Sequence, residues 1–351
     1  MDLMNSKERI KALILKEPID RVPFMPFFVS YLAVDNDVSL KDFFSNPVLA
    51  FDAGESTMNR HPWANIRPVY GWGDHGAWEF GGKIAWPKDN MSMTPYTPEP
   101  LISSPEGVDS LTVPDPRETE WYRLRSEFNE ICSRNGQSVQ LPSGSILTQL
   151  ASILEIKNLM KWIIKYPDAL HRLAKKVLSF TLTMAEITIE KYGARDCTVM
   201  TDLATESNDL ISPRVFEEFC LPYIKALHGF YYESGVRSMM IHLCGNHAGN
   251  LKYWKEIPIP ERAIFSIGDS MNLEETGEIL GSRYILAGNI STTTLQWGEP
   301  EDVKREVRRC LKQAMRRDGG FILMPACEWP PLAPRNNLDA VRDALIEDGF
   351  Y

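Results

Sequence analysis

The 351-residue sequence has no long hydrophobic run: no window approaches the ~18 uninterrupted apolar residues of a membrane-spanning helix. Its first residues show no basic start followed by an apolar stretch, so we expect no secretory signal and a cytoplasmic protein. The sequence also lacks an excess of basic residues, since 47 Asp and Glu outnumber 38 Lys and Arg and the net charge is −9. This balance argues against a broad surface for nucleic acid or anionic membrane, although a small basic pocket remains open.

Cysteine is also sparse. Six cysteines in a chain of this length do not form a disulfide framework, so we expect reduced thiols that serve as core residues or metal ligands. The apolar fraction of 44% and the charged fraction of 24% are ordinary for a globular protein, and the chain is long enough to bury a large core.

What the sequence does contain is an alternation of apolar strand patterns and amphipathic helical patterns from about residue 137 onward. The predicted strands are Val22–Phe28, one strand within 64–86, and 138–142, 197–202, 237–243, 263–267, 284–288 and 320–325. Eight strands alternating with helices favour a (β/α)8 TIM barrel formed by one domain, residues 1–351. The alternative is a doubly wound open sheet, but no G-x-G-x-x-G or P-loop follows an early strand.

Two additions to the barrel are predicted. Asn5 and Glu8 form a capping-box pattern ahead of a helical stripe, which indicates an N-terminal helical extension. Residues 60–120 form a long insertion near the barrel mouth, rich in Trp, Tyr, Gly and Pro in its first part. Within it, Trp78 to Trp86 with Gly81-Gly82 between them suggests a hairpin.

The strongest chemical signal is His242-Leu243-Cys244-Gly245 together with the distant Cys327. His242 and Cys244 are two residues apart at the end of a predicted strand, so their side chains share one face. Cys327 ends the last predicted strand, and the carboxyl ends of barrel strands surround the active site. One imidazole and two thiolates form a good zinc site with a fourth position open for substrate. The alternative is that these cysteines are core residues, as we expect for the remaining four, Cys132, Cys197, Cys220 and Cys310.

Weaker candidates surround the same face. Asp202, Glu206 and Asp209 follow the fourth strand and either position substrate and act as a general acid, or form a helix-cap and loop network. Asn289 ends the seventh strand and could hydrogen-bond a ligand. In the insertion, the candidate substrate-binding residues are Trp72, Asp74, His75 and Trp78. The alternatives there are a hydrophobic plug for the aromatic residues and a surface role for His75. Trp329, beside Cys327, is a candidate lid on the mouth.

Over nearly its whole length, the sequence resembles the uroporphyrinogen decarboxylase superfamily, and within it the corrinoid-dependent methyltransferases. The resemblance rests on Asp20-Arg21-Val22-Pro23, Leu141-Pro142-Ser143-Gly144 and Ala287-Gly288-Asn289-Ile290. The methyltransferase branch is indicated by His242-Leu243-Cys244-Gly245 and by Cys327 ahead of the Pro-rich segment 330–334. This resemblance implies a TIM barrel with zinc bound by His242, Cys244 and Cys327. It also suggests Asp269 as a fourth ligand, by similarity to a carboxylate after the sixth strand.

One departure from the family bears on the reaction. The decarboxylases have arginines after the first strand that bind porphyrinogen carboxylates, whereas this sequence has no Arg between Arg21 and Arg60. We therefore rank decarboxylation below methyl transfer.

The predicted function is zinc-dependent transfer of a methyl group from a small substrate to the cob(I)amide of a corrinoid protein. A methoxylated aromatic is the expected donor, because the aromatic residues of the insertion could stack on a flat ring. The alternatives are methyl transfer from methylcobamide to a thiol or tetrahydropterin, uroporphyrinogen decarboxylation, and a non-catalytic zinc-stabilised binding subunit. The oligomeric state stays open, with a homodimer among the options.

Overall fold

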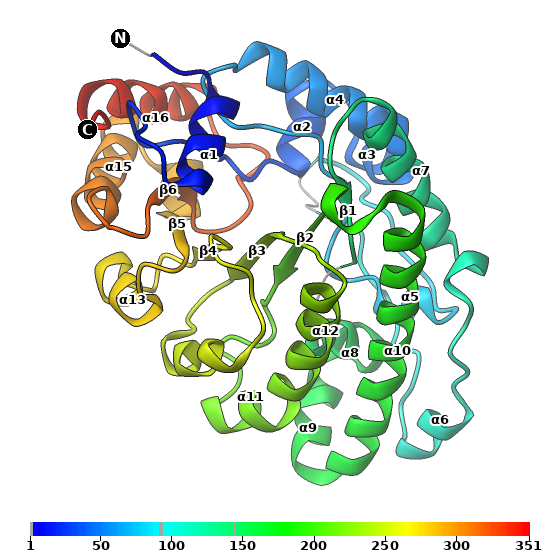
Figure 1. Cartoon of the computed structure of the whole chain (residues 1–351). Helices are drawn as coiled ribbons and strands as arrows, with labels where there is room; N and C mark the ends of the chain where they lie inside the picture. The colour runs from blue at the N-terminus through cyan, green and yellow to red at the C-terminus, as the bar shows by residue number, and fades with distance from the viewer. Residues whose placement is uncertain (1–2, 91–93, 143–144) are drawn as a thin grey trace.

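The computed structural model describes residues 3–90, 94–142 and 145–351. Its parallel sheet has the strand order β1-β2-β3-β4-β5-β6. The strands are β1 Val139–Gln140, β2 Cys197–Asp202, β3 Ser238–Leu243, β4 Ile264–Ile267, β5 Ile285–Ile290 and β6 Phe321–Pro325. All six lie within or beside the predicted strands. The helices surround them (Figure 1), as expected for a β/α barrel.

The helices follow the alternation that the sequence predicts. Before β1 lie α1 Ser6–Leu15, α2 Ser30–Asp35, α3 Leu40–Ser45, α4 Pro47–Arg60, α5 Gly76–Glu79, α6 Pro105–Ser110, η1 Pro116–Glu118 and α7 Glu120–Arg134. Between β1 and β4 lie α8 Ile146–Leu154, α9 Ile156–Lys165, α10 Pro167–Tyr192, η2 Ala194–Asp196, α11 Pro213–Phe219, α12 Leu221–Glu233 and η3 Ala248–Glu256. After β4 come α13 Leu273–Leu280, α14 Thr292–Trp297, α15 Pro300–Ala314 and α16 Arg335–Asp348. The capping box predicted at Asn5 and Glu8 begins α1.

The first two predicted strands occupy the remaining positions of the barrel without forming full ladders. Phe24 forms a parallel bridge to Leu323 of β6. On either side of this bridge, Met25 N–H donates to Leu323 O at 3.0 Å and Leu323 N–H donates to Pro23 O at 2.9 Å. Asn65 N–H then donates to Phe24 O at 2.8 Å, so residues 64–70 follow next around the barrel. The strand expected within 64–86 is therefore an extended segment with one such hydrogen bond rather than a regular strand.

An arginine bridges the barrel wall between this segment and β1. Arg125 of α7 donates to the carbonyl oxygen of Tyr70 on one side, and to Gln140 Oε1 at 2.8 Å on the other. Its second terminal nitrogen donates to the carbonyl oxygens of Gln140 and Leu141. Carbonyls that a regular ladder would pair are thus satisfied by one side chain.

The inward-facing side chains of β3 to β6 form an apolar layer inside the barrel. A core cluster contains Met25, Met240, Ile264, Ile285, Ile322 and Met324, capped from below by Leu13 of α1. Two residues further along the same face of β3 lies His242. The side-chain alternation of a strand therefore places the candidate ligands directly above an apolar floor.

The aromatic insertion differs in detail from the prediction. Trp78 lies in the short helix α5, so it does not pair with Trp86 in a hairpin. The antiparallel pairing in this region joins Ala85 and Tyr96, through hydrogen bonds of 2.8 and 3.1 Å. The Gly81-Gly82 pair follows α5 instead of forming a strand turn, because the amides of both glycines bond back to residues of that helix.

No helix in the part of the chain that the structure describes is both long enough and apolar enough to cross a bilayer.

Candidate metal centre and adjoining cavity

Three residues from two distant parts of the chain meet at the carboxyl end of the sheet. His242 belongs to β3, Cys244 follows that strand directly, and Cys327 lies two residues after β6. One ligand atom from each lies within 4.8 Å of the other two, and the two Sγ atoms are 3.6 Å apart. In the described residues, no fourth His, Cys, Asp or Glu joins this group. The structure thus brings together the three residues predicted to bind zinc.

Gly245 allows the chain to turn immediately after Cys244. Its φ angle is +81°, and a Cβ at this position would lie 2.8 Å from both Ser207 Oγ and Asp209 Oδ2. Ser207 and Asp209 in turn accept hydrogen bonds from the Asn246 backbone amide. A glycine is therefore required here, both for the left-handed backbone and for the close approach of the neighbouring loop.

The surroundings of His242 fit a metal ligand. Its Nδ1 lies 3.1 Å from Ser266 Oγ, whereas its buried Nε2 has no hydrogen-bond partner in the described structure. A partner on one ring nitrogen fixes the ring orientation and leaves the other nitrogen available to a metal. Phe27 packs edge-on against the same ring. A buried and unsatisfied nitrogen next to two thiols matches the nitrogen and sulfur donors that zinc prefers.

The ionisation of these groups depends on their mutual contacts. Burial alone would lower the pKa of His242, but the Cys327 thiol and the Asp202 carboxylate outweigh burial, so the pKa is raised. The hydrogen bond with Cys244, together with burial, raises the pKa of the Cys327 thiol far above its usual range. Binding of a cation would have to displace these protons, as metal binding to thiols generally does.

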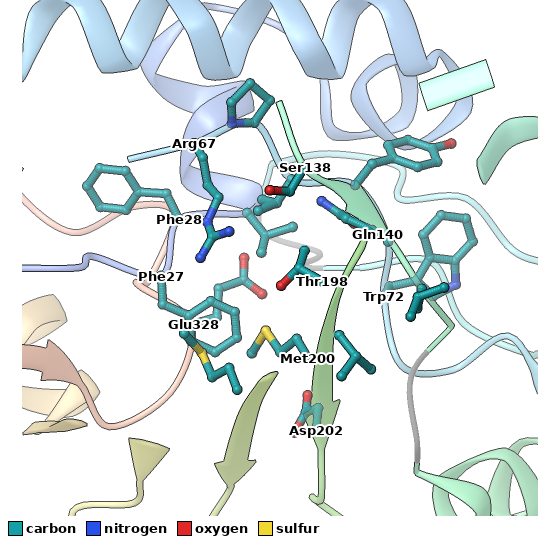
Figure 2. A pocket seen from close by; sticks show the side chains of 18 of the residues that line it. Phe27, Phe28, Arg67, Trp72, Ser138, Gln140, Thr198, Met200, Asp202 and Glu328 are labelled. Atoms are coloured by element: carbon teal, nitrogen blue, oxygen red, sulfur yellow. The ribbon is translucent and has the colours of Figure 1, made fainter. Parts of the chain in front are cut away.

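A cavity of about 420 Å³ lies in the barrel, and none of the three candidate ligands is among its lining residues. It adjoins the centre through Phe27, which packs on the His242 ring, and through Asp202, which is paired with His242 across the sheet. It lies where residues 65–73 face β1 without a ladder. Figure 2 shows its lining, with the aromatic rings of Phe27, Phe28 and Trp72 and the polar side chains of Arg67, Asp202 and Glu328. This volume is in the ordinary range for small-molecule sites, which is about 300–1,000 Å³.

The three candidate acids occupy different places. Asp202 lines the cavity, and its Oδ1 has no hydrogen-bond partner in the described structure. Burial raises its pKa, although His242 opposes that shift. Glu206 is buried, accepts hydrogen bonds from Ser145 Oγ at 3.0 and 3.2 Å, and does not line the cavity. Asp269 is exposed and does not belong to the group of three ligands.

The aromatic candidates of the insertion mostly pack on one another. Trp72 stacks on Trp78 and contacts Trp121 edge-on, so the cluster is largely a hydrophobic plug. Trp72 and His75 reach the cavity wall, whereas Asp74 and Trp78 are not among the lining residues. Asp74 Oδ2 accepts from the amide of Thr97. His75 is buried beside Glu79, with 3.1 Å between Nδ1 and Oε1, rather than at the surface.

Two further candidates are held inside the protein. Asn289 is buried and donates to the carbonyl oxygens of Gly268 and Met271 at 2.9 and 2.8 Å. Its own oxygen accepts from Arg309 of α15. Trp329 is 0% exposed and packs edge-on against Phe24, Phe28 and Tyr31. This is the position of a core side chain, not of a lid at the surface.

Two polar residues of the cavity were not predicted. Glu328 follows Cys327, and its Oε1 accepts from the backbone amide of Ser30 at 2.6 Å. Burial raises the pKa of Glu328 to about 7. Arg67 comes from the extended segment before Trp72. The adjacency of Glu328 to Cys327 was a signal in the sequence, whereas Arg67 lies in a segment without a recognisable pattern.

A family model described as uroporphyrinogen decarboxylase (URO-D) matches residues 5–347. The chain belongs to the uroporphyrinogen decarboxylase family. A curated relative, uroporphyrinogen decarboxylase 2, chloroplastic, from Oryza sativa subsp. japonica, is 27% identical over 196 residues. That match covers 54% of this chain but only 47% of the relative, or about half its length.

Among solved structures, a methyltransferase from Methanosarcina mazei aligns with a TM-score of 0.76 and 21% identity. The alignment covers 98% of this chain and 99% of that one, so the two proteins share their fold from end to end. A B12-independent methionine synthase from Shewanella sp. W3-18-1 aligns over 64% of this chain and 67% of its own, with 14% identity and a TM-score of 0.42. The family and the first of these structures confirm the predicted barrel and the predicted superfamily.

Proposed function

We propose that this protein is a zinc-dependent methyltransferase that moves a methyl group from a small methylated substrate to the cob(I)amide of a corrinoid protein. The observation that carries the proposal is the meeting of His242, Cys244 and Cys327 beside a small-molecule cavity. Three ligands leave a fourth position, which is the usual arrangement of catalytic rather than structural zinc. A non-catalytic zinc-stabilised subunit would instead need a closed set of four.

One group of residues would bind the metal, and Asp202 would contact the substrate. His242, Cys244 and Cys327 would hold zinc, which would supply Lewis acidity toward an oxygen or sulfur of the substrate. Ser266 orients the His242 ring through Nδ1. Asp202 offers an unpaired carboxyl oxygen to the same space and would hydrogen-bond the oxygen that loses its methyl group.

A methoxylated aromatic fits the apolar part of the cavity. Phe27, Phe28 and Trp72 belong to the lining of the cavity, and an aromatic ring packs well against apolar side chains. Met200 and Met240 line the same space with flexible side chains that adapt to the shape of a ligand. A substrate ring here would lie between Arg67 and the side of the cavity that carries Asp202.

The corrinoid protein would reach the methyl group from the carboxyl ends of the strands. The segment that follows Cys327 in the chain includes the exposed Leu332 and Arg335. His247, on the loop after Cys244, is fully buried and lies 2.8 Å from the carbonyl oxygen of Leu203, so it belongs to the protein interior. The docking surface must therefore be sought among the exposed residues around it.

The test is a direct assay of methyl transfer. The purified protein with zinc is incubated with cob(I)alamin and, in separate reactions, with methoxyaromatics, methanol or methylamines, and the cob(I)alamin absorbance is followed. Loss of that absorbance with methoxyaromatics supports the proposal. Loss with another donor class alone would refute the aromatic donor. No loss with any donor, together with demethylation of methylcobalamin by a thiol or a tetrahydropterin, would establish the opposite direction of transfer.

A further inference from the structure

Two arginines line the cavity, and their surroundings differ. Arg125 uses its guanidinium to donate to Tyr70 O, Gln140 Oε1 and neighbouring carbonyls, so its hydrogen-bonding capacity is largely consumed. Arg67 has neither a hydrogen bond nor an ion pair with any residue in the described ranges of the chain. Its side chain is half-buried at the cavity wall, and the partial loss of solvent there lowers the pKa of its guanidinium.

A guanidinium in such surroundings is only partly solvated. It has lost part of its hydration without gaining a hydrogen-bond acceptor or a counter-charge from the described residues. A guanidinium that lines a cavity without a protein partner keeps its N–H donors available to a ligand in that cavity. An anionic ligand would supply both the missing charge and the missing acceptors.

The geometry leaves room for that ligand. Figure 2 shows the Arg67 side chain reaching into the cavity from the segment before Trp72, on the opposite side from Asp202. The two carboxyl groups that line the cavity belong to Glu328, which accepts from Ser30, and to Asp202, and neither forms an ion pair with Arg67 in the described structure. The side chains of Ser138 and Phe28 lie on the same side of the cavity as Arg67 (Figure 2).

We propose that Arg67 binds the carboxylate of an aromatic acid, so that the substrate is a methoxylated benzoate rather than a neutral methoxybenzene. The methyl-donor role rests on the function proposed above, but the recognition of a carboxylate does not. Two parallel N–H donors of a guanidinium match the two oxygens of a carboxylate, and Lys offers no such pair. With the carboxylate at Arg67, the ring lies among Phe27, Phe28 and Trp72, and a para methoxy group extends toward Asp202.

The experiment compares a charged ligand with its neutral counterpart, in the absence of corrinoid. Calorimetry measures binding of 4-methoxybenzoate and of methoxybenzene to the full-length protein near neutral pH. We expect the wild type to bind the benzoate about ten- to a hundredfold more tightly. Arg67→Gln should abolish that preference without weakening the binding of methoxybenzene, and Arg67→Lys should restore it only in part. Arg195→Gln, at an exposed arginine in η2, is the matched control and should bind like the wild type.

Folding of Arg67→Gln is checked by thermal unfolding, and no loss of stability is expected because the side chain has no partner to lose. Equal affinities of the wild type for both ligands, no binding of either, or an equal loss of both in Arg67→Gln would overturn the proposal. Tighter binding of 4-methoxybenzenesulfonate than of the benzoate would replace carboxylate by sulfonate as the recognised anion. If the benzoate binds through Arg67 but no donor methylates cob(I)alamin, the carboxylate site stands and the proposed function fails.

Discussion

Asp202 of β2 and His242 of β3 are directly paired across two neighbouring parallel strands. Paired residues of adjacent strands project from the same face of a sheet, so the carboxyl group lies beside the imidazole inside the barrel. Asp202 thus lines the cavity and is also the strand partner of a candidate metal ligand. This pairing joins the two halves of the site that the sequence could only propose separately.

Asp202→Asn should therefore separate catalysis from metal binding. The amide keeps the shape of the side chain but cannot serve as an acid, and removal of general acid–base catalysis costs about 10²–10⁴ in rate. We expect a loss of methyl transfer in this range, with zinc content and thermal stability unchanged. Asp196→Asn, at an exposed carboxylate in η2, is the control. Full activity of Asp202→Asn would place the proton chemistry elsewhere.

Cys244→Ala and Cys327→Ala should each reduce zinc from about one ion per chain to well below it, since two protein ligands hold zinc poorly. Both variants should stay folded, because a barrel of this size has a core of its own. Metal content is measured by plasma mass spectrometry and folding by circular dichroism. Cys132→Ala, at a buried thiol on α7 away from the ligands, should keep its zinc. Undiminished zinc in both ligand variants would show that the metal lies at another site.

The metal ligands were accessible to prediction because their signal is local. Strands β4, β5 and β6 are buried along their whole length and are largely apolar in sequence. The spacing of His242 and Cys244 places their side chains on one face of a strand whatever the neighbours are. The prediction of Cys327 as a ligand depended only on its position at the end of the last predicted strand. These inferences need a strand assignment but no knowledge of tertiary packing.

The cavity and the packing of the tryptophans could not be predicted from the sequence in the same way. Arg67, Asp202 and Glu328 are far apart in sequence, and only the barrel closure brings them to one space. Whether an aromatic residue packs in the core or faces a ligand depends on its neighbours in three dimensions. Trp329 is fully buried among such neighbours, so it is a core residue rather than a lid. The hairpin expected from Trp78 to Trp86 is wrong for a related reason, since the residues before Gly81 form the helical turn of α5.

The buried Glu206 predicts a pH dependence of stability. Burial raises its pKa from 4.5 to about 7 in the folded protein, although the Ser145 hydroxyl opposes the shift. A raised carboxyl pKa means that the folded state holds a proton that the unfolded state releases. The contribution of Glu206 to stability is therefore fully present below about pH 4.5 and is lost as the pH rises to about 7.

Glu206→Gln removes this titration. Its free energy of unfolding relative to the wild type should rise by roughly 3 kcal/mol between about pH 4.5 and pH 8, as a shift of about two and a half pKa units implies. Urea unfolding at a series of pH values measures the difference. Glu186→Gln, at an exposed position of α10, should follow the wild-type curve. Parallel curves for Glu206→Gln and the wild type would mean that Glu206 ionises normally.

Substitution of Trp329 tests whether this side chain is a core residue or a lid. Its full burial against Phe24, Phe28 and Tyr31 predicts that Trp329→Ala lowers the free energy of unfolding by about 3–5 kcal/mol. Trp297→Ala removes an equally large side chain that is 81% exposed, so its effect should stay within about 0.5 kcal/mol. Urea unfolding compares the two variants. If Trp329→Ala were as stable as Trp297→Ala yet lost ligand binding, the lid would be the correct interpretation.

Uroporphyrinogen provides the last test, because the family takes its name from the decarboxylation of this substrate. A porphyrinogen with several carboxylates needs several cationic partners. Within the described residues, the cavity offers two arginines, and Arg125 is already bound to backbone carbonyls and Gln140. A single available guanidinium at Arg67 suits one carboxylate. We therefore expect no release of carbon dioxide above the uncatalysed rate, measured with carboxyl-labelled uroporphyrinogen beside an authentic decarboxylase. Turnover at the rate of that enzyme would show that the polycarboxylate binds outside this cavity, and decarboxylation would then displace methyl transfer as the proposed reaction.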